Sequence, residues 1–142
     1  MTIHIRLATV YDAEELSILN QEFNGGTRRS SLEIKDRLVQ GKELVAVASE
    51  NDKLVGFACA QYFTSFCYDE PQGEITEMYV RESARRKGIA TSLIAILEKK
   101  LQDLHVREVK ILTGTKNLEA LQTYTKSHYA KQEETVLFKE LD

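Results

Sequence analysis

Three cations precede a single glycine at the start of an amphipathic segment of the chain. Arg85, Arg86 and Lys87 lead into Gly88, and apolar side chains then recur every three or four positions over residues 89–104. A solvated helix normally begins with Asp or Glu, because the positive end of the helix dipole repels cations. Cations are favourable there if an anion with several charges binds to the side chains and to free backbone N–H groups. The pattern therefore predicts an anion-binding loop.

The order strand, basic turn, helix is a phosphate-binding arrangement, with residues 74–82 as the strand. The better-known nucleotide signatures are absent, since the sequence holds neither GxGxxG nor GxxxxGK followed by Ser or Thr. We therefore expect a different phosphate-containing ligand.

The remaining elements alternate between strand-like and helix-like segments. Residues 30–38 carry a capping-box signature from Ser30 to Glu33, and Asp12 is placed to cap the helix before them. The pattern predicts strands over 3–9, 43–49, 54–63, 74–82, 108–115 and 133–141, and helices over 12–23, 30–38, 89–104 and 117–129. The order β-α-α-β-β-β-α-β-α-β is that of a mixed α/β (α+β) domain.

Size and composition indicate one domain over residues 1–142. The chain is 42% hydrophobic, which is enough for a sizeable core, and no repeat or Pro/Gly/Ser linker divides it. A net charge of -3 with scattered basic residues argues against a nucleic-acid partner. No apolar run approaches the ~20 residues that span a bilayer, so we expect no membrane insertion.

The cysteines and histidines argue against disulfide or metal chemistry. Cys59 and Cys67 have no CxxC spacing, and the start of the chain lacks the apolar region of a signal peptide, so we expect a reducing cytoplasm. The three histidines are scattered along the chain, and no metal site is expected. Oligomeric state is left open, a homodimer included.

Two motifs in the expected order resemble those of one enzyme family. Residues 85–90 fit R-x-x-G-x-A and resemble the acetyl-CoA pyrophosphate loop of the GNAT superfamily of N-acetyltransferases. Asn117, Ala120 and Tyr124 resemble its N-x-x-A-x-x-x-Y pattern, which follows a strand and opens a helix. The resemblance covers residues 74–138, while the earlier residues match in the order of elements. Residues 90–100 and 120–142 look closest to aminoglycoside 3-N-acetyltransferase-like members.

The resemblance implies a GNAT-like fold, acetyl-CoA as cosubstrate, and a mostly antiparallel sheet splayed between the fourth and fifth strands. Asn117 looks like a pantetheine contact and equally like a helix cap. The residues expected to bind the cofactor are Met78, Tyr79 and Val80 through their backbone, the cations Arg85, Arg86 and Lys87, the N–H groups of Gly88, Ile89 and Ala90, the Thr91 hydroxyl, and Asn117 and Tyr124.

Catalysis of acetyl transfer to an amine needs a proton acceptor and a proton donor. Tyr124 is expected to protonate the departing thiolate, and Glu77 or Glu74 to accept the proton of the amine, with Glu77 favoured. Because these carboxylates are an odd number of positions apart, they should face opposite sides of a strand unless a bulge intervenes. One departure from the family is His128 where a glycine usually ends the last helix. Ala90 stands where glycine is also frequent.

The leading hypothesis is an acetyl-CoA-dependent N-acetyltransferase acting on a small amine. Acidic residues near the expected acceptor side favour a cationic amine; they are Glu14, Glu15, Glu22, Asp69, Glu70, Glu74 and Glu77. A protein lysine or N-terminal acetyltransferase is the second enzyme hypothesis. A CoA-binding regulatory module without turnover is the alternative from another class.

Overall fold

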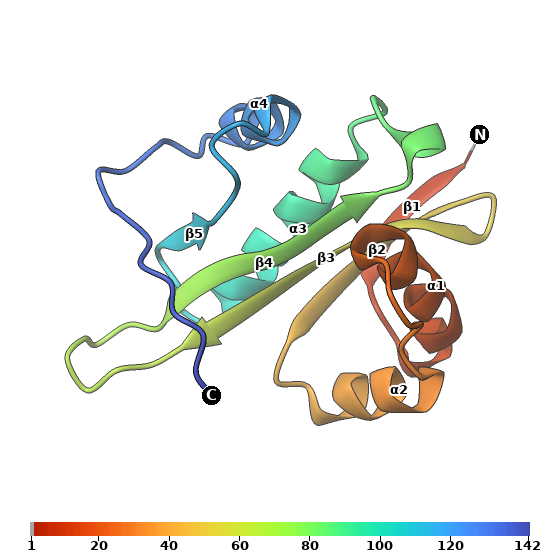
Figure 1. The fold of residues 1–142 in the computed structure, drawn as a ribbon, viewed down its shortest axis with the longest axis horizontal. Coiled ribbons are helices and arrows are strands. Elements are labelled where there is room, and N and C mark those ends of the chain that lie inside the picture. Colours follow the sequence, from red (N-terminus) through yellow and green to blue (C-terminus); the bar gives the residue numbers. More distant parts are fainter. Residues whose placement is uncertain (1) are drawn as a thin grey trace.

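A five-stranded mixed sheet forms the centre of the molecule in the computed structural model, which describes residues 2–142 (Figure 1). The strands lie in chain order: β1 (Ile3–Leu7), β2 (Leu44–Glu50), β3 (Lys53–Phe63), β4 (Gln72–Val80) and β5 (Val109–Ile111). Strands β1 to β4 pair antiparallel with one another, and β5 runs parallel to β4. This mixed sheet is the one that the sequence predicted, apart from its last strand.

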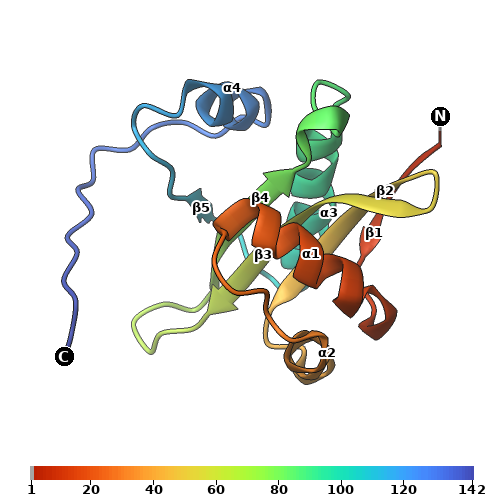
Figure 2. The same ribbon diagram turned by 45° about the vertical axis from the view of Figure 1, so that its right-hand side comes forward.

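Helices cover both faces of the sheet (Figure 2). They are α1 (Ala13–Asn24) and α2 (Ser31–Gln40) on one face, and α3 (Ile89–Asp103) and α4 (Leu118–Lys126) on the other, with 3-10 turns at Val10–Asp12 and Glu82–Ala84. Helix α1 packs Leu16 and Leu19 against Val47 and Phe57. Within residues 2–142, no helix is both long and apolar enough to cross a membrane.

Helix α3 buries the apolar stripe that the sequence indicated. Ile89, Leu93, Leu97 and Leu101 are at most 3% exposed and pack on alanines and branched residues of β2, β3 and β4. Small strand residues such as Ala58 let the helix approach the sheet closely. This packing fixes the start of α3, and with it the basic loop, against the end of β4.

Strand β4 diverges from β5 after a short stretch of pairing. Only Gly73, Glu74 and Ile75 pair with β5, whereas β4 continues to Val80 beyond the last of these pairs. The expected splay between the fourth and fifth strands is confirmed. One edge of β4 is therefore left without a partner strand in the region that leads to the basic loop.

Two expectations about local structure need correction. Ser30 caps α2 by accepting a hydrogen bond from the Leu32 N–H, but Glu33 pairs with Arg29 and does not complete a capping box. The Asp12 side chain makes no cap bond to α1; it accepts from Arg6 and from the Thr9 N–H. The buried carboxylate is satisfied by its ion pair with Arg6 of β1, so it does not bond the first N–H groups of the helix.

The strand predicted over residues 133–141 is wrong for the single chain. Residues 131–142 are all exposed and form no ladder with the sheet, and Figure 2 shows this segment running away from β5. The alternating pattern signals that the segment suits a strand, but pairing also requires that the chain return to the sheet edge. Helix α4 instead directs the chain outward.

Candidate active site

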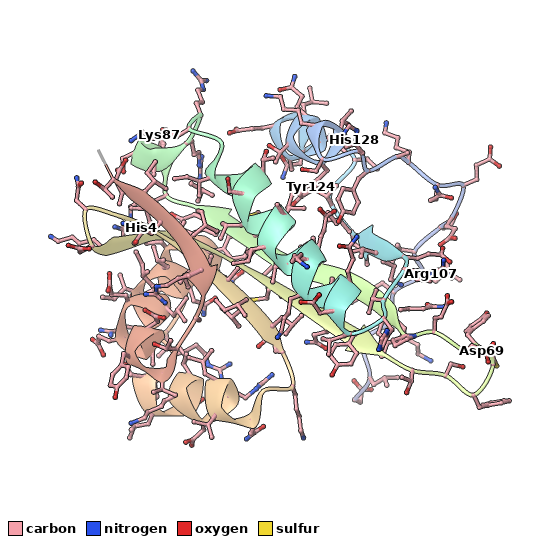
Figure 3. All side chains as sticks on the ribbon, turned by 180° about the vertical axis from the view of Figure 1, so that it is seen from behind. His4, Asp69, Lys87, Arg107, Tyr124 and His128 are labelled. Carbon is pink, nitrogen blue, oxygen red and sulfur yellow. The ribbon has the colours of Figure 1, made fainter. Side chains whose placement is uncertain are left out.

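A cleft of about 1260 Å³ opens where β4 and β5 diverge. Its walls come from the end of α1, the second half of β4, the loop before α3, the residues after β5, and α4. Figure 3 labels Tyr124 on α4 and Lys87 in the loop before α3, two of the elements that supply these walls. The cleft thus joins segments that are far apart in the sequence.

The basic loop has the backbone conformation of an anion site. Arg86 and Gly88 both have positive φ angles, of 65° and 76°, and α3 begins directly after Gly88. Ser92 N–H donates to the Gly88 carbonyl, so the N–H groups of the preceding residues come before the helical hydrogen-bond ladder. A Cβ at Gly88 would meet no heavy atom within 4 Å, so the space beside this residue at the start of α3 is open.

The three cations of the loop have different surroundings. Arg86 lines the cleft, and Arg85 lines it while donating from Nε to the Val80 carbonyl at 2.8 Å. Lys87 does not line the cleft; its ammonium lies 2.7 Å from a carboxylate oxygen of Glu50. The structure therefore brings Arg85 and Arg86 to the predicted site, and directs Lys87 toward β2.

Strand β4 contains a bulge at Thr76. On β3, Cys59 pairs with Glu77 and Gln61 pairs with Glu74, so two steps on β3 match three steps on β4. Since directly paired residues point to the same face, Glu74 and Glu77 share one face of the sheet. For both carboxylates to face the same side of the strand, the sequence required a bulge, and this bulge is present.

The two carboxylates nevertheless differ in their surroundings. Glu74 does not line the cleft and lies 3.7 Å from the ammonium of Lys110 on β5. Glu77 lines the cleft, and within residues 2–142 no hydrogen bond or ion pair engages its side chain. Burial raises the pKa of Glu77 above the ordinary carboxyl value, and the negative charge of Glu43 adds to the rise. Of the two carboxylates, Glu77 is therefore the one that lies where a proton could be accepted in the cleft.

Helix α4 supplies the other predicted side chains. Asn117 caps the helix, its side-chain oxygen accepting from the Ala120 N–H at 3.2 Å, and it also lines the cleft. Tyr124 lies further along α4, lines the cleft and packs against the apolar core under α3. Burial raises the pKa of Tyr124, so its phenol keeps its proton at neutral pH.

The remaining cofactor residues of the prediction also border the cleft. Met78, Tyr79 and Val80 line it from β4, and Ile89, Ala90 and Thr91 line it from the first turn of α3. Cys59 on β3 pairs with Glu77, and burial, with the nearby carboxylates of Glu43 and Glu77, raises the pKa of its thiol. A buried neutral thiol is a poor nucleophile, so a covalent role for Cys59 is disfavoured.

Most of the acidic residues expected on the acceptor side are neutralised by partners. Glu14 pairs with Arg28, Glu22 with Arg81, Glu70 with Arg107 and Glu74 with Lys110. Glu15 accepts from the Leu54 N–H. Such long-range pairs cannot be read from the sequence. Of the seven acidic residues expected on the acceptor side, they leave Glu77 as the one that lines the cleft without an ion-pair partner among the described residues.

The border formed by the end of α1 is a part of the site that sequence reasoning missed. Glu22 accepts from the Tyr79 hydroxyl at 3.0 Å and from Arg81 at 2.6 Å, and Phe23 stacks on Tyr79 with ring centroids 5.4 Å apart. Glu22 and Phe23 both line the cleft. These contacts fix α1 against β4 at the mouth of the cleft.

A family model described as the acetyltransferase (GNAT) family matches residues 11–129. The chain belongs to this family. The resemblance stated from the two motifs is confirmed, as is the expectation of an acyltransferase, and the match extends it to α1 and α2. His128, where GNAT members usually have glycine, has a φ of 71°, so the histidine adopts the left-handed conformation that the glycine would take.

Several solved structures share the fold. An aminoglycoside acetyltransferase, meta-AAC0020 from an uncultured soil metagenomic sample, in complex with sisomicin, has a TM-score of 0.85 at 20% identity, covering 98% of this chain and 95% of its own. AAC(6')-Iy in complex with the bisubstrate analogue CoA-S-monomethyl-acetylneamine has a TM-score of 0.86 at 18% identity, covering 100% of both chains.

A ribosomal-protein-alanine N-acetyltransferase from Brucella melitensis biovar Abortus 2308 has a TM-score of 0.82 at 19% identity, covering 99% of this chain and 100% of its own. At these identities the likeness concerns the GNAT fold, which both small-molecule and protein acetyltransferases adopt. A search of curated protein sequences finds no match. The closer likeness to 3-N-type aminoglycoside enzymes stays a prediction.

Proposed function

We propose that this GNAT member transfers an acetyl group from acetyl-CoA to the primary amine of a small cationic molecule. The observation that carries the proposal is the cleft itself: it joins the basic loop, the free edge of β4, Glu77 and Tyr124. These are the groups that acetyl transfer needs. All of these groups line one cleft, and the chain belongs to the GNAT acetyltransferase family.

The residues at the loop fit a CoA pyrophosphate. Arg85 and Arg86 supply positive charge, and the N–H groups from Gly88 to Thr91 lie at a helix start whose first turn holds no acidic residue. Gly88 keeps the approach open. Bound there, acetyl-CoA would supply the activated acetyl thioester. The unpaired edge of β4 at Met78, Tyr79 and Val80 would accept its pantetheine arm as an added strand.

Two protein groups would move the protons. Glu77, with its raised pKa, would accept the proton of the incoming amine directly or through water, since an amine with a pKa near 10.4 is almost fully protonated at pH 7. Tyr124, protonated at neutral pH, would donate to the departing thiolate. A backbone N–H of β4 would polarise the thioester carbonyl.

The acceptor class follows from the charge of the cleft. Glu77 is unpaired and Glu43 adds negative charge beside it, which would attract an ammonium group and repel a carboxylate. Two of the structural neighbours are aminoglycoside acetyltransferases, which act on amines of this charge. We also place the enzyme in the cytoplasm, since Cys59 and Cys67 are both free thiols.

A panel of acceptors tests the proposal. Release of CoA thiol is followed with acetyl-CoA and, in turn, a polyamine, an aminoglycoside, a neutral amine, and peptides with an N-terminal alanine or an internal lysine. We expect turnover with the cationic small amines, with a kcat/KM that falls as salt rises, because the Debye length shortens to ~8 Å at physiological ionic strength.

Two other outcomes identify the competing functions. Turnover with the peptides alone would identify a protein acetyltransferase like the Brucella neighbour. Tight binding of acetyl-CoA, by calorimetry, without thiol release from any acceptor would identify a CoA-binding regulatory module.

A further inference from the structure

Glu22 lies in the last turn of α1, where an acidic side chain is locally unfavourable. The C-terminal end of a helix carries a partial negative charge that repels a carboxylate, and the last turn of α1 holds no basic residue to offset it. The compensating cation comes from the end of β4, 59 positions along the chain. Residues that break a local rule are expected at functional sites, so the partner of Glu22 is informative.

The partner is Arg81, which binds the Glu22 carboxylate through two nitrogens. Arg81 Nε lies 3.0 Å from Oε1, and Nη2 lies 2.6 Å from Oε2. The Tyr79 hydroxyl donates to the same Oε1 at 3.0 Å. The bond from Arg81, with a smaller contribution from Tyr79, lowers the pKa of Glu22, so the carboxylate stays charged at neutral pH. A two-point arginine–carboxylate pair also fixes the planes of both groups.

Arg81 is the residue at which β4 turns into the basic loop. Its N–H donates to the Val55 carbonyl at 2.8 Å, and its carbonyl accepts from the Ala84 N–H at 2.8 Å at the start of the 3-10 turn. Four positions on, Arg85 donates from Nε to the Val80 carbonyl. The position of Arg81 therefore helps to set where the loop cations lie.

Helix α1 supports the end of β4 on one face of the sheet. Within residues 2–142, β5 pairs only with residues 73–75 of β4, so the end of β4 has no neighbouring strand on that side. Tyr79 and Arg81 are two positions apart and project on the same face, toward α1. Phe23, next to Glu22, stacks on Tyr79 with ring centroids 5.4 Å apart. The contacts of Glu22 and Phe23 thus replace part of the support that a strand would give.

We propose that Glu22 is a positioning residue for acetyl-CoA, which holds Arg81 and Tyr79 and thereby fixes the end of β4 and the basic loop that follows it. This inference rests on the proposed function, because it takes the loop as the pyrophosphate site. Glu22 acts through Arg81 and not by contact with the cofactor, since a carboxylate repels a pyrophosphate.

Charge and position predict opposite effects when this carboxylate is removed. Glu22 is an anion that lines the same cleft as the loop. By charge alone, its loss would strengthen the binding of the anionic CoA. If Glu22 holds the loop in place, its loss weakens CoA binding in spite of that gain. The direction of the change in CoA affinity therefore separates a positioning role from a purely electrostatic effect.

Calorimetric titration with CoA measures this direction. Glu22→Gln is expected to raise the dissociation constant of CoA roughly five-fold, as for other residues that act through a packed neighbour. Glu33→Gln is the matched control and should leave the affinity unchanged, since Glu33 on α2 is paired with Arg29 at 2.9 Å and does not line the cleft. An unchanged or stronger affinity in Glu22→Gln would overturn the proposal.

A double-mutant cycle tests whether Glu22 acts through Arg81. In an Arg81→Gln chain the pair is already broken, so the further change Glu22→Gln should weaken CoA binding by less than about two-fold. Arg81→Lys keeps the charge but not the two-point geometry, and should weaken binding nearly as much as Glu22→Gln does. Additive effects of the two Gln changes, or wild-type affinity in Arg81→Lys, would overturn the proposal.

Thermal unfolding without ligand separates positioning from a merely structural role. The side chains of Arg81 and Glu22 are 35% and 34% exposed, so Glu22→Gln should lower Tm only slightly, much as Glu33→Gln does. A clear loss of Tm with unchanged CoA affinity would make the pair structural and overturn the proposal. If the wild-type protein itself fails to bind CoA, the proposed function fails and this inference fails with it; if it binds and Glu22→Gln binds equally well, only this inference fails.

Discussion

Glu74 and Glu77 lie on the same face of β4, but only Glu74 has a cation beside it, the ammonium of Lys110 at 3.7 Å. The bulge at Thr76 creates this arrangement, and the parallel pairing of β5 supplies the lysine. One carboxylate is thereby ion-paired where β4 meets β5, while the other lines the cleft without an ion-pair partner. The structure therefore gives different surroundings to two carboxylates that the sequence ranked only by a slight preference for Glu77.

Replacement of Glu77 is expected to slow acetyl transfer selectively. Glu77→Gln removes the proton acceptor and should lower kcat/KM by roughly a hundred-fold, within the usual range for a general base. Glu74→Gln is the matched control, because the same change at a paired carboxylate outside the cleft removes no acceptor. Initial rates of CoA release with one amine measure both, and equal losses would contradict the assignment.

The pH dependence should report the raised pKa of Glu77. The base acts as a carboxylate, so kcat/KM rises as the pH passes the pKa of Glu77, which burial and the charge of Glu43 hold above the ordinary carboxyl value. Glu43→Gln removes that charge, lowers the pKa of Glu77, and should move the acidic limb to lower pH. A pH profile of kcat/KM checks the direction. An unchanged or upward-shifted limb would count against this coupling.

Loss of the Tyr124 hydroxyl should affect turnover more than binding. Tyr124→Phe is expected to lower kcat by roughly ten-fold to a thousand-fold with little change in the affinity for acetyl-CoA. Tyr129→Phe is the control, since Tyr129 donates to Glu98 and does not line the cleft. It should cost about 1 kcal/mol of stability and leave kcat unchanged. A parallel loss of affinity in Tyr124→Phe would indicate a packing role instead.

A side chain at Gly88 should obstruct CoA. Gly88→Val places a β-branched residue at a φ of 76° and fills the open space before the N–H groups, so the dissociation constant should rise at least about ten-fold. Gly41→Val is the matched control: its φ is 64° and its Cβ also meets nothing within 4 Å, but it lies at the end of α2. Calorimetric titration with CoA decides, after both variants are shown to be folded. Equal affinities would mean that the loop does not hold the pyrophosphate.

The loop cations should contribute unequally to CoA binding. Arg86 lines the cleft, whereas Lys87 is directed to Glu50 and does not. Arg86→Ala should therefore weaken CoA binding about ten-fold, as expected for a charge-assisted phosphate contact, and Lys87→Ala by much less. The same titration measures both variants. A larger effect of Lys87→Ala would show that the lysine turns toward the ligand on binding.

The parts of the site that depend on local pattern were predictable from the sequence. The cations, Gly88 and the apolar stripe of α3 are a local signal, as is the spacing from Asn117 to Tyr124, and the structure brings both motifs to one cleft. Strand and helix order follow from periodicity for the same reason.

Features that depend on partners distant in the chain were not predictable. The bulge at Thr76 appears only in the pairing of β4 with β3, and the partners of Lys87 and Glu22 lie 37 and 59 positions away. The prediction of a strand over residues 133–141 was wrong for the same physical reason. A sequence pattern shows that a segment tends to be extended, but it does not show whether a strand edge lies within reach. Because the segment pairs with no edge, Val136, Leu137 and Phe138 are exposed in the single chain.

The most direct test of the proposed acetyl transfer is a mass-spectrometric measurement of the acceptor after incubation with acetyl-CoA and the wild-type protein, run beside Tyr124→Phe. We expect a cationic amine such as a polyamine or an aminoglycoside to gain one acetyl group for each CoA thiol released, and the variant to form the same product far more slowly. Thiol release without an acetylated amine, or an acetylated amine formed equally fast by Tyr124→Phe, would contradict it.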